Sequence, residues 1–290
     1  MTTVTKAPYG YYSVDPLPSI EELEEHYKKK YYQNEHSQYA SSYTEEEISY
    51  FLIAPKVAEY ILKNTGNISN GKLLDVGAGE GYFAKYFYEN KWEVTTCDFS
   101  SFGMEQHNPS LLDTLIEGDI FRSLENQEKT KNKYDLINLS NVLEHVIDPV
   151  HLLQTLRKLL NDSSLLRIAV PNDYSKFQEM LLKRKLTTNT WYAPPEHLHY
   201  FTIEPLRNLL ESLDYTIQVL MADFPIELYL LNQYSNYVKH KDVGKQAHFS
   251  RVVADNFIFD QGVDKYVNYY TACAEANLGR QLIVYASKNV

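Results

Sequence analysis

The chain has 290 residues, 44% of them hydrophobic, which is enough to bury the core of one large domain. Its 38 acidic and 28 basic residues leave a formal net charge of −10, so we expect no nucleic-acid partner. Two cysteines, Cys97 and Cys273, exclude a disulfide framework and a four-thiolate metal site, and the apolar runs are too short to cross a bilayer. We therefore expect a cytoplasmic protein without membrane partners, either a monomer or a homodimer.

Residues 1–48 are polar and rich in tyrosine, and prolines occur early in the segment. We expect an irregular arm that folds over the rest of the chain as a lid. Within it, Ser19 and Glu22 have the spacing of a capping box, which predicts one short helix from about Ile20.

Short apolar runs separated by helical patterns follow from residue 49. These runs predict seven strands, at 72–76, 93–97, 114–117, 134–139, 165–170, 215–220 and 281–286. Helices are expected between them, notably at 81–89, where Phe83 and Phe87 share a face, and at 149–160, which carries a leucine stripe. Strands that alternate with helices predict an α/β fold with a mostly parallel sheet covered on both faces.

The last two predicted strands are separated by about 55 residues with helical texture, 224–278. Adjacent antiparallel strands need a link of only a few residues. We therefore divide the chain into the arm, a main domain formed by 49–223 and 279–290, and a helical cap inserted at 224–278.

The strongest local signal is a glycine loop between the first predicted strand of this domain and its helix. Gly77, Gly79 and Gly81 let the backbone turn tightly at a helix N-terminus, which suits an anionic group. The spacing G-x-G-x-G differs from the G-x-G-x-x-G of dinucleotide-binding loops, and this disfavours a nicotinamide oxidoreductase. Asp75 precedes the loop and repels phosphate, but it suits an ammonium group, so an amino-acid moiety fits the loop best.

Two more acidic residues follow the next two predicted strands. Asp98 stands where a carboxylate accepts hydrogen bonds from both ribose hydroxyls in a doubly wound sheet. Asp119 is placed to accept from an adenine amine while Ile120 packs on the ring. The alternatives are that Asp98 caps a turn, that Asp119 solvates a loop, and that Phe99 and Ile120 are core residues.

These elements together resemble the class I S-adenosylmethionine-dependent methyltransferases, in particular the small-molecule group that includes ubiquinone-biosynthesis and sugar-tailoring enzymes. The resemblance covers residues 50–220 and the last strand, and rests on the glycine loop, Asp98-Phe99-Ser100, Gly118-Asp119-Ile120 and the run from Tyr134 to Pro149. It implies a Rossmann-like seven-stranded sheet whose last strand is antiparallel, and S-adenosyl-L-methionine as the cofactor. The implied cofactor-binding residues are Asp75, Gly77, Gly79, Gly81, Asp98, Phe99, Asp119, Ile120 and Ser140.

Methyl transfer to a group that carries a proton needs a base near the sulfonium. His145 follows the fourth strand and has an ordinary pKa close to neutral pH, so we predict it as the catalytic base; the alternative is a histidine that fixes the helix start or bonds to Glu144. Ubiquinone-type relatives carry a glutamate three residues before the Glu-His pair and bind a divalent cation there. Asn141 stands in that place here. A cation held by Glu144 and His145, with His197 or His199, therefore stays open.

The segment after the fifth strand carries His197, His199 and Tyr200, which we predict to contact the acceptor. Histidines at i and i+2 point the same way if the segment is extended. The alternative is that one packs under the next helix while the other faces water. Tyrosines of the arm are expected to line the acceptor pocket as well: Tyr31, Tyr32, Tyr39 and Tyr43.

We predict methylation of a small molecule, at oxygen, with a sugar or another secondary metabolite as the favoured acceptor. One alternative is N-methylation of an amino sugar or amine. The other is a cofactor-binding subunit without transferase activity.

Overall fold

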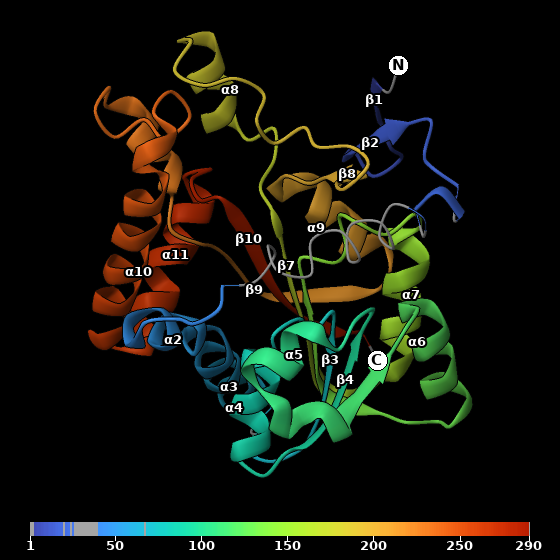
Figure 1. Ribbon diagram of the computed structural model, residues 1–290. Helices are drawn as coiled ribbons and strands as arrows, with labels where there is room; N and C mark the ends of the chain where they lie inside the picture. Colours follow the sequence, from blue (N-terminus) through green and yellow to red (C-terminus); the bar gives the residue numbers. More distant parts are fainter. Residues whose placement is uncertain (1–2, 20, 24, 26–39, 67, 290) are drawn as a thin grey trace.

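A seven-stranded sheet forms the centre of the molecule in the computed structural model, which describes residues 3–19, 21–23, 25, 40–66 and 68–289 (Figure 1). The strand order is β5-β4-β3-β6-β7-β10-β9. The strands are β3 (Lys72–Val76), β4 (Glu93–Asp98), β5 (Leu115–Glu117), β6 (Tyr134–Ser140), β7 (Leu160–Pro171), β9 (Tyr215–Ala222) and β10 (Gln281–Lys288). Only β10 runs antiparallel to its neighbours in this sheet. The predicted α/β fold with an antiparallel last strand is confirmed.

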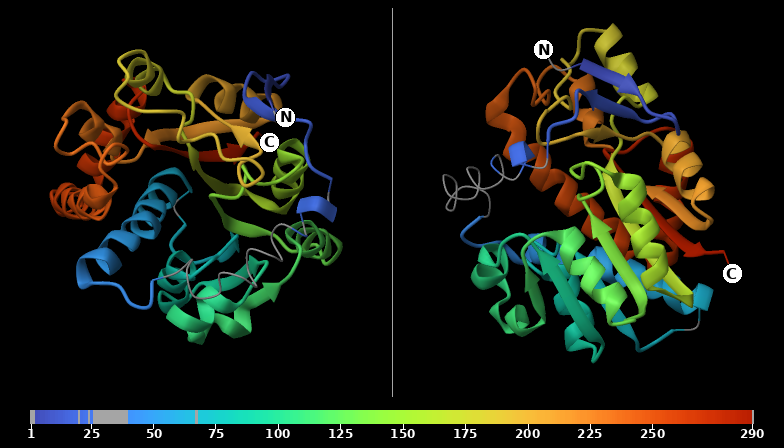
Figure 2. Two further views of the ribbon diagram at one scale, coloured as in Figure 1. Left: turned by 45° about the horizontal axis from the view of Figure 1, so that its top comes forward. Right: turned by 90° about the vertical axis from the view of Figure 1, so that its right-hand side faces the viewer.

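Helices cover both faces of the sheet because the buried strands are apolar on both sides. One face packs against α6 (Ile120–Lys129), α7 (Pro149–Leu159) and α9 (Ile203–Ser212). The other packs against α3 (Ile53–Gly66), α4 (Tyr82–Glu89) and α11 (Val263–Glu275). Figure 2 shows these two helical layers on either side of the strands. Short elements complete this part of the chain: α5 (Phe102–His107), η1 (Pro109–Thr114) and α8 (Lys176–Lys183).

The segment between β9 and β10 is helical. It contains η2 (Ile226–Leu231), η3 (Lys241–Val243), α10 (Gly244–Asp260) and α11. Helix α10 lies beside α2 (Glu45–Phe51), and Asn256 donates to the Glu46 carbonyl over 2.9 Å (Figure 1). The inserted helices and the end of the N-terminal segment therefore meet at one side of the molecule.

The beginning of the chain is more regular than expected. Strands β1 (Thr3–Lys6) and β2 (Tyr12–Asp15) form a hairpin, and β2 also pairs with β8 (His199–Tyr200). Gly10 permits the turn with its φ of 94°. The prediction of an irregular start is wrong because a distant strand supplies the pairing that the hairpin lacks on its own.

The capping pair in the arm is present: Glu22 accepts from the Ser19 backbone N–H over 2.8 Å, and Ser19 accepts in return over 3.2 Å. Most of the helix expected there, with Tyr31, Tyr32 and Tyr39, lies outside the described residues. Among the helices that the structure describes, none is both long and apolar enough to cross a bilayer.

Candidate active site

The glycine loop joins β3 to α4 in a backbone conformation that suits glycine. Gly77, Gly79 and Gly81 have φ values of 73°, 54° and 80°. A Cβ on Gly77 would lie 2.3 Å from Val142 Cγ2, so the loop also passes too close to its neighbour for any side chain. The Gly79 N–H donates to Asp98 Oδ2 over 2.8 Å, which fixes the loop against the end of β4. The loop and Asp98 therefore form one unit.

A row of buried polar side chains crosses four strands below the loop. Asp75 Oδ1 accepts from Asn138 over 2.6 Å, and Asn138 accepts from Arg167 over 2.7 Å. Arg167 also donates from Nε to Tyr285 Oη over 3.3 Å. The strand register places these four residues side by side on β3, β6, β7 and β10. Sequence analysis missed Asn138 and Arg167, although each interrupts an otherwise apolar strand.

Asp75 is the one member of this row with an unused acceptor. Its side chain is 1% exposed, and its Oδ2 has no hydrogen-bond partner. Burial raises the pKa of Asp75 from 3.8 to about 6, while the bond from Asn138 and the Arg167 charge partly oppose that rise. A buried carboxylate oxygen without a partner is costly, and an ammonium group at this place would satisfy it. The site thus fits the amino-acid end of the implied cofactor.

A cavity of about 350 Å³ opens beside the loop and the polar row. Its lining comes from α2, α3, the glycine loop, four strand ends and the inserted helices. Among the predicted cofactor residues, Asp75, Gly77 and Ser140 line it. Its floor is polar and its side walls are aromatic, with Tyr50, Phe51, Tyr82, Phe83, Tyr266 and Tyr285.

The other predicted cofactor residues lie at the neighbouring strand ends, outside the cavity lining. Asp98 is buried, and this burial raises the pKa of its carboxyl, while the backbone N–H groups it accepts from act in the opposite direction. Asp119 is exposed at the start of α6 and accepts from the Arg122 N–H over 2.8 Å. The Gly118 N–H donates to the Asp98 carbonyl over 2.8 Å, which keeps the ends of β4 and β5 together. Phe99 and Ile120 are half-buried there.

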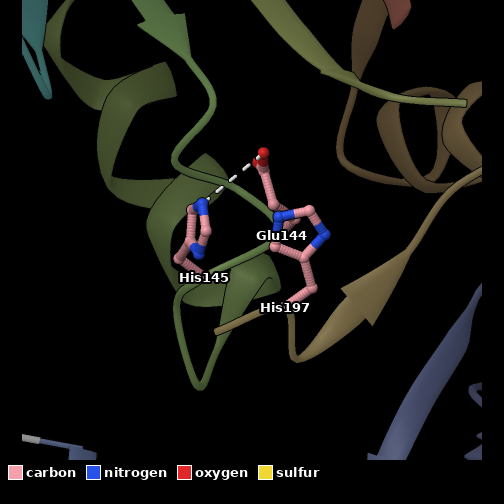
Figure 3. A group of neighbouring side chains, drawn as sticks. All are labelled: Glu144, His145 and His197. Carbon is pink, nitrogen blue, oxygen red and sulfur yellow. Dashed lines mark ion pairs between the residues drawn. The ribbon is translucent and has the colours of Figure 1, made fainter. Parts of the chain in front are cut away.

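A second group of side chains, Glu144, His145 and His197, lies after β6 (Figure 3). His145 Nε2 is 3.7 Å from Glu144 Oε1, and the two imidazole rings are 4.9 Å apart. His145 Nδ1 is 2.6 Å from the Glu196 carbonyl, which only accepts, so Nδ1 carries the hydrogen and Nε2 is the basic atom.

The same group has the donor set of a divalent-cation site. One ligand atom from each residue lies within 4.8 Å of the others. Glu144 Oε2 and His197 Nδ1 are buried without hydrogen-bond partners. Burial raises the pKa of Glu144 to about 8, and the nearby Asp173 charge adds to the rise. A cation would satisfy both unpartnered atoms, so these residues fit one.

The prediction that His199 and Tyr200 contact the acceptor is wrong. His199 is 2% exposed, and both ring nitrogens are used: Nδ1 with Ser13 Oγ over 2.7 Å, and Nε2 with the Val146 carbonyl over 2.9 Å. Burial lowers the pKa of His199 to about 4. Tyr200 is buried as well, and its hydroxyl donates to the His197 carbonyl over 3.0 Å. Both residues hold β8 against the N-terminal hairpin.

His145 and His197 do not reach the large cavity. Among the described residues that line it there is no histidine. The second group therefore stands apart from the cavity, although both follow the end of β6.

Comparisons with known proteins agree with this geometry. A family model described as a methyltransferase domain matches residues 43–219, more than half of the chain. The ubiquinone biosynthesis O-methyltransferases of Yersinia enterocolitica and Vibrio atlanticus are 28% and 29% identical over 110 residues, 37% of this chain and 46% of each relative. The match to this chain thus spans about half the length of those relatives.

Solved structures resemble the whole fold. The plantazolicin methyltransferase BpumL, in complex with a monoazolic desmethylPZN analog and SAH, has a TM-score of 0.54 at 16% identity, covering 93% of this chain and 98% of that one. BamL, another plantazolicin methyltransferase, has a TM-score of 0.52 at 14% identity, covering 93% and 91%. The chain therefore belongs to the methyltransferase-domain family, and the predicted resemblance to class I S-adenosylmethionine-dependent methyltransferases is confirmed.

Proposed function

We propose that this chain transfers a methyl group from S-adenosylmethionine to a small-molecule acceptor in the cavity beside the glycine loop. The methionine end of the cofactor is assigned to Asp75, the loop and Ser140, and the ribose to Asp98. Phe99, Asp119 and Ile120 take the adenine side, at the ends of β4 and β5. When bound, the cofactor supplies an electrophilic methyl group on a sulfonium.

The protein contributes mainly alignment, since methyl transfer is an in-line displacement. The Gly79–Asp98 hydrogen bond and the contact of Gly77 with Val142 hold the loop rigid before any ligand arrives. The aromatic walls of the cavity exclude water from the acceptor. The single observation that carries this proposal is that the glycine loop and the unpartnered Asp75 Oδ2 face one cavity large enough for a second reactant.

The arm and the insertion are proposed to cover this cavity. Tyr43 donates to Glu80 Oε1 over 2.6 Å, which ties the end of the 1–48 arm to the glycine loop. Asp255 and Tyr266 of the 224–278 insertion line the opposite wall. These contacts support the division into arm, main domain and cap.

Calorimetric titration with S-adenosylhomocysteine and with NAD tests the cofactor assignment. We expect S-adenosylhomocysteine to bind and NAD not to bind; binding of NAD alone would contradict the proposal. Incubation with labelled cofactor and a metabolite extract then tests for transfer, and binding without any labelled product would favour the subunit without transferase activity.

O-methylation with His145 as base is a second candidate, favoured by the free geometry of Nε2 in the Glu144–His145–His197 group. A divalent cation held there would lower the pKa of an acceptor hydroxyl. His145→Ala is expected to abolish turnover under this candidate and to leave the affinity for S-adenosylhomocysteine unchanged. Substantial turnover by His145→Ala would contradict it.

A further inference from the structure

Carboxylates outnumber cationic groups in the cavity. Four acidic side chains line it, namely Asp75, Glu80, Asp223 and Asp255, against Arg167 as the single basic side chain among the described lining residues. The Arg167 guanidinium is already engaged, since it donates to Asn138 and Tyr285 and stacks 5.3 Å from the Phe83 ring centroid.

Two further arginines lie behind the cavity wall and reduce this imbalance without removing it. Arg251 lies 5.4 Å from the Tyr50 ring centroid, and its charge acts on both Asp223 and Asp255. Arg280 forms a 2.6 Å ion pair with Asp173, so its charge is used on another carboxylate. Arg167 and Arg251 thus face four carboxylates, and the cavity keeps a negative surplus.

Asp255 is the most informative of these carboxylates because the insertion brings it to the site. It is 1% exposed on α10 and accepts hydrogen bonds from the hydroxyls of Tyr266 and Tyr270 on α11. Burial of a carboxylate is costly unless a partner compensates for lost hydration. A helix that only covered the cavity would have no need for an acid there.

The aromatic walls favour a cation as well. Tyr50, Phe51 and Tyr266 line the side from which α2, α3 and the insertion enclose the cavity. The faces of such rings attract ammonium groups, by about 0.5–2 kcal/mol each. A neutral sugar would gain nothing from this combination of rings and carboxylates.

We infer that the acceptor is a small amine that binds as an ammonium ion between Asp255, Asp223 and the tyrosine wall, and that the enzyme is an N-methyltransferase. This inference rests on the proposed function, since it names the acceptor class for the same cavity. It also assigns Asp75 a separate task, because its unpartnered oxygen faces the glycine loop side and serves the amino group of the cofactor.

The reaction balances with groups already at the site. The amine first loses one proton to the Asp255 carboxylate, whose pKa burial raises to about 6. The freed nitrogen lone pair forms the N–C bond to the methyl carbon. The C–S bond breaks with its electron pair on sulfur, so the products are the methylated amine and S-adenosylhomocysteine. The proton leaves Asp255 for water after product release.

The test separates a metabolite extract on a cation exchanger at pH 7 and incubates each fraction with methyl-labelled S-adenosylmethionine. We expect label in the retained, cationic fraction, in a product whose fragmentation places the methyl group on nitrogen. The identified amine is then titrated against the protein saturated with S-adenosylhomocysteine. Asp255→Asn and Asp223→Asn should each weaken amine binding by about 10- to 100-fold, with the affinity for S-adenosylhomocysteine changed less than about 3-fold.

Asp264→Asn is the matched control, since it removes an exposed carboxylate from the same insertion. It should leave both affinities unchanged. Thermal unfolding checks that each variant is folded, and asparagine keeps an oxygen acceptor for the hydroxyls of Tyr266 and Tyr270.

The other outcomes have distinct meanings. Label confined to neutral or acidic metabolites, or amine binding insensitive to both cavity variants, would overturn the amine assignment and leave the proposed function intact. Label in neither fraction would overturn the proposed small-molecule transfer itself.

Discussion

Replacement of Asp75 by asparagine is expected to stabilise the free protein and to weaken its cofactor binding. Folding raises the pKa of this carboxyl from 3.8 to about 6, so the folded state holds the charged form at a cost. A difference of this size corresponds to roughly 3 kcal/mol at pH 7. Asparagine removes the charge and keeps an oxygen acceptor for Asn138. Its unpaired amide hydrogens cost about 1 kcal/mol, so the net gain is about 2 kcal/mol.

The sign of the pH dependence follows from the direction of the pKa change. Between pH 3.8 and about 6 the folded protein binds more protons at Asp75 than the unfolded chain does. The stability contributed by this residue therefore falls as the pH rises through that window. Asp75→Asn should be more stable than the parent protein at pH 7.5, and the gain should disappear near pH 4.

Urea unfolding at both pH values measures the stability, and calorimetric titration at pH 7.5 measures the affinity for S-adenosylhomocysteine. We expect the affinity to fall by about 10- to 100-fold, because the ammonium group loses a charged partner. Asp264→Asn serves as the control and should change neither quantity. An equal stability change at both pH values, or unchanged cofactor affinity, would refute the role assigned to Asp75.

Three further variants test other parts of the site. Gly77→Ala should lose binding of S-adenosylhomocysteine, measured by titration, because its Cβ would lie 2.3 Å from Val142 Cγ2 at a φ of 73°; retained affinity would contradict a rigid loop. His199→Ala should lower the free energy of unfolding by about 2–4 kcal/mol at pH 8 without changing that affinity. The deficit should narrow as the pH falls from 6.5 towards 4, where the buried parent histidine itself becomes unfavourable; a deficit independent of pH would contradict this. Tyr43→Phe keeps the ring contacts but loses the bond to Glu80, so we expect S-adenosylhomocysteine to dissociate about 3- to 10-fold faster in stopped-flow displacement; an unchanged rate would separate the arm from cofactor retention.

The sheet and the glycine loop were predictable because their signals are local. The expected strand at 72–76 and the loop that follows it match β3 and its turn, since an apolar run, an aspartate and spaced glycines lie within ten residues. The polar row across the sheet was missed, yet Asn138 and Arg167 carry a readable signal. A polar residue between apolar neighbours in a buried strand requires a partner.

The role of His199 was not predictable from its own segment. Its spacing from His197 suggested that both side chains share a face, but only His199 and Tyr200 belong to a strand there. The partner that buries His199 is Ser13, 186 residues away in a hairpin that the prolines concealed. Contacts between segments so distant in sequence leave no local pattern.

The division of the cavity explains why the family is clear and the acceptor is not. The family match ends at residue 219, and it contains the glycine loop, Asp98 and the polar row up to Arg167. Asp223, Asp255 and Tyr266 lie beyond that point. The cofactor half of the site therefore lies within the region that defines the family, while the half assigned to the acceptor lies outside it. Since the relatives align with this chain over only 110 residues, their acceptors carry no weight for a cavity whose acidic wall the insertion supplies.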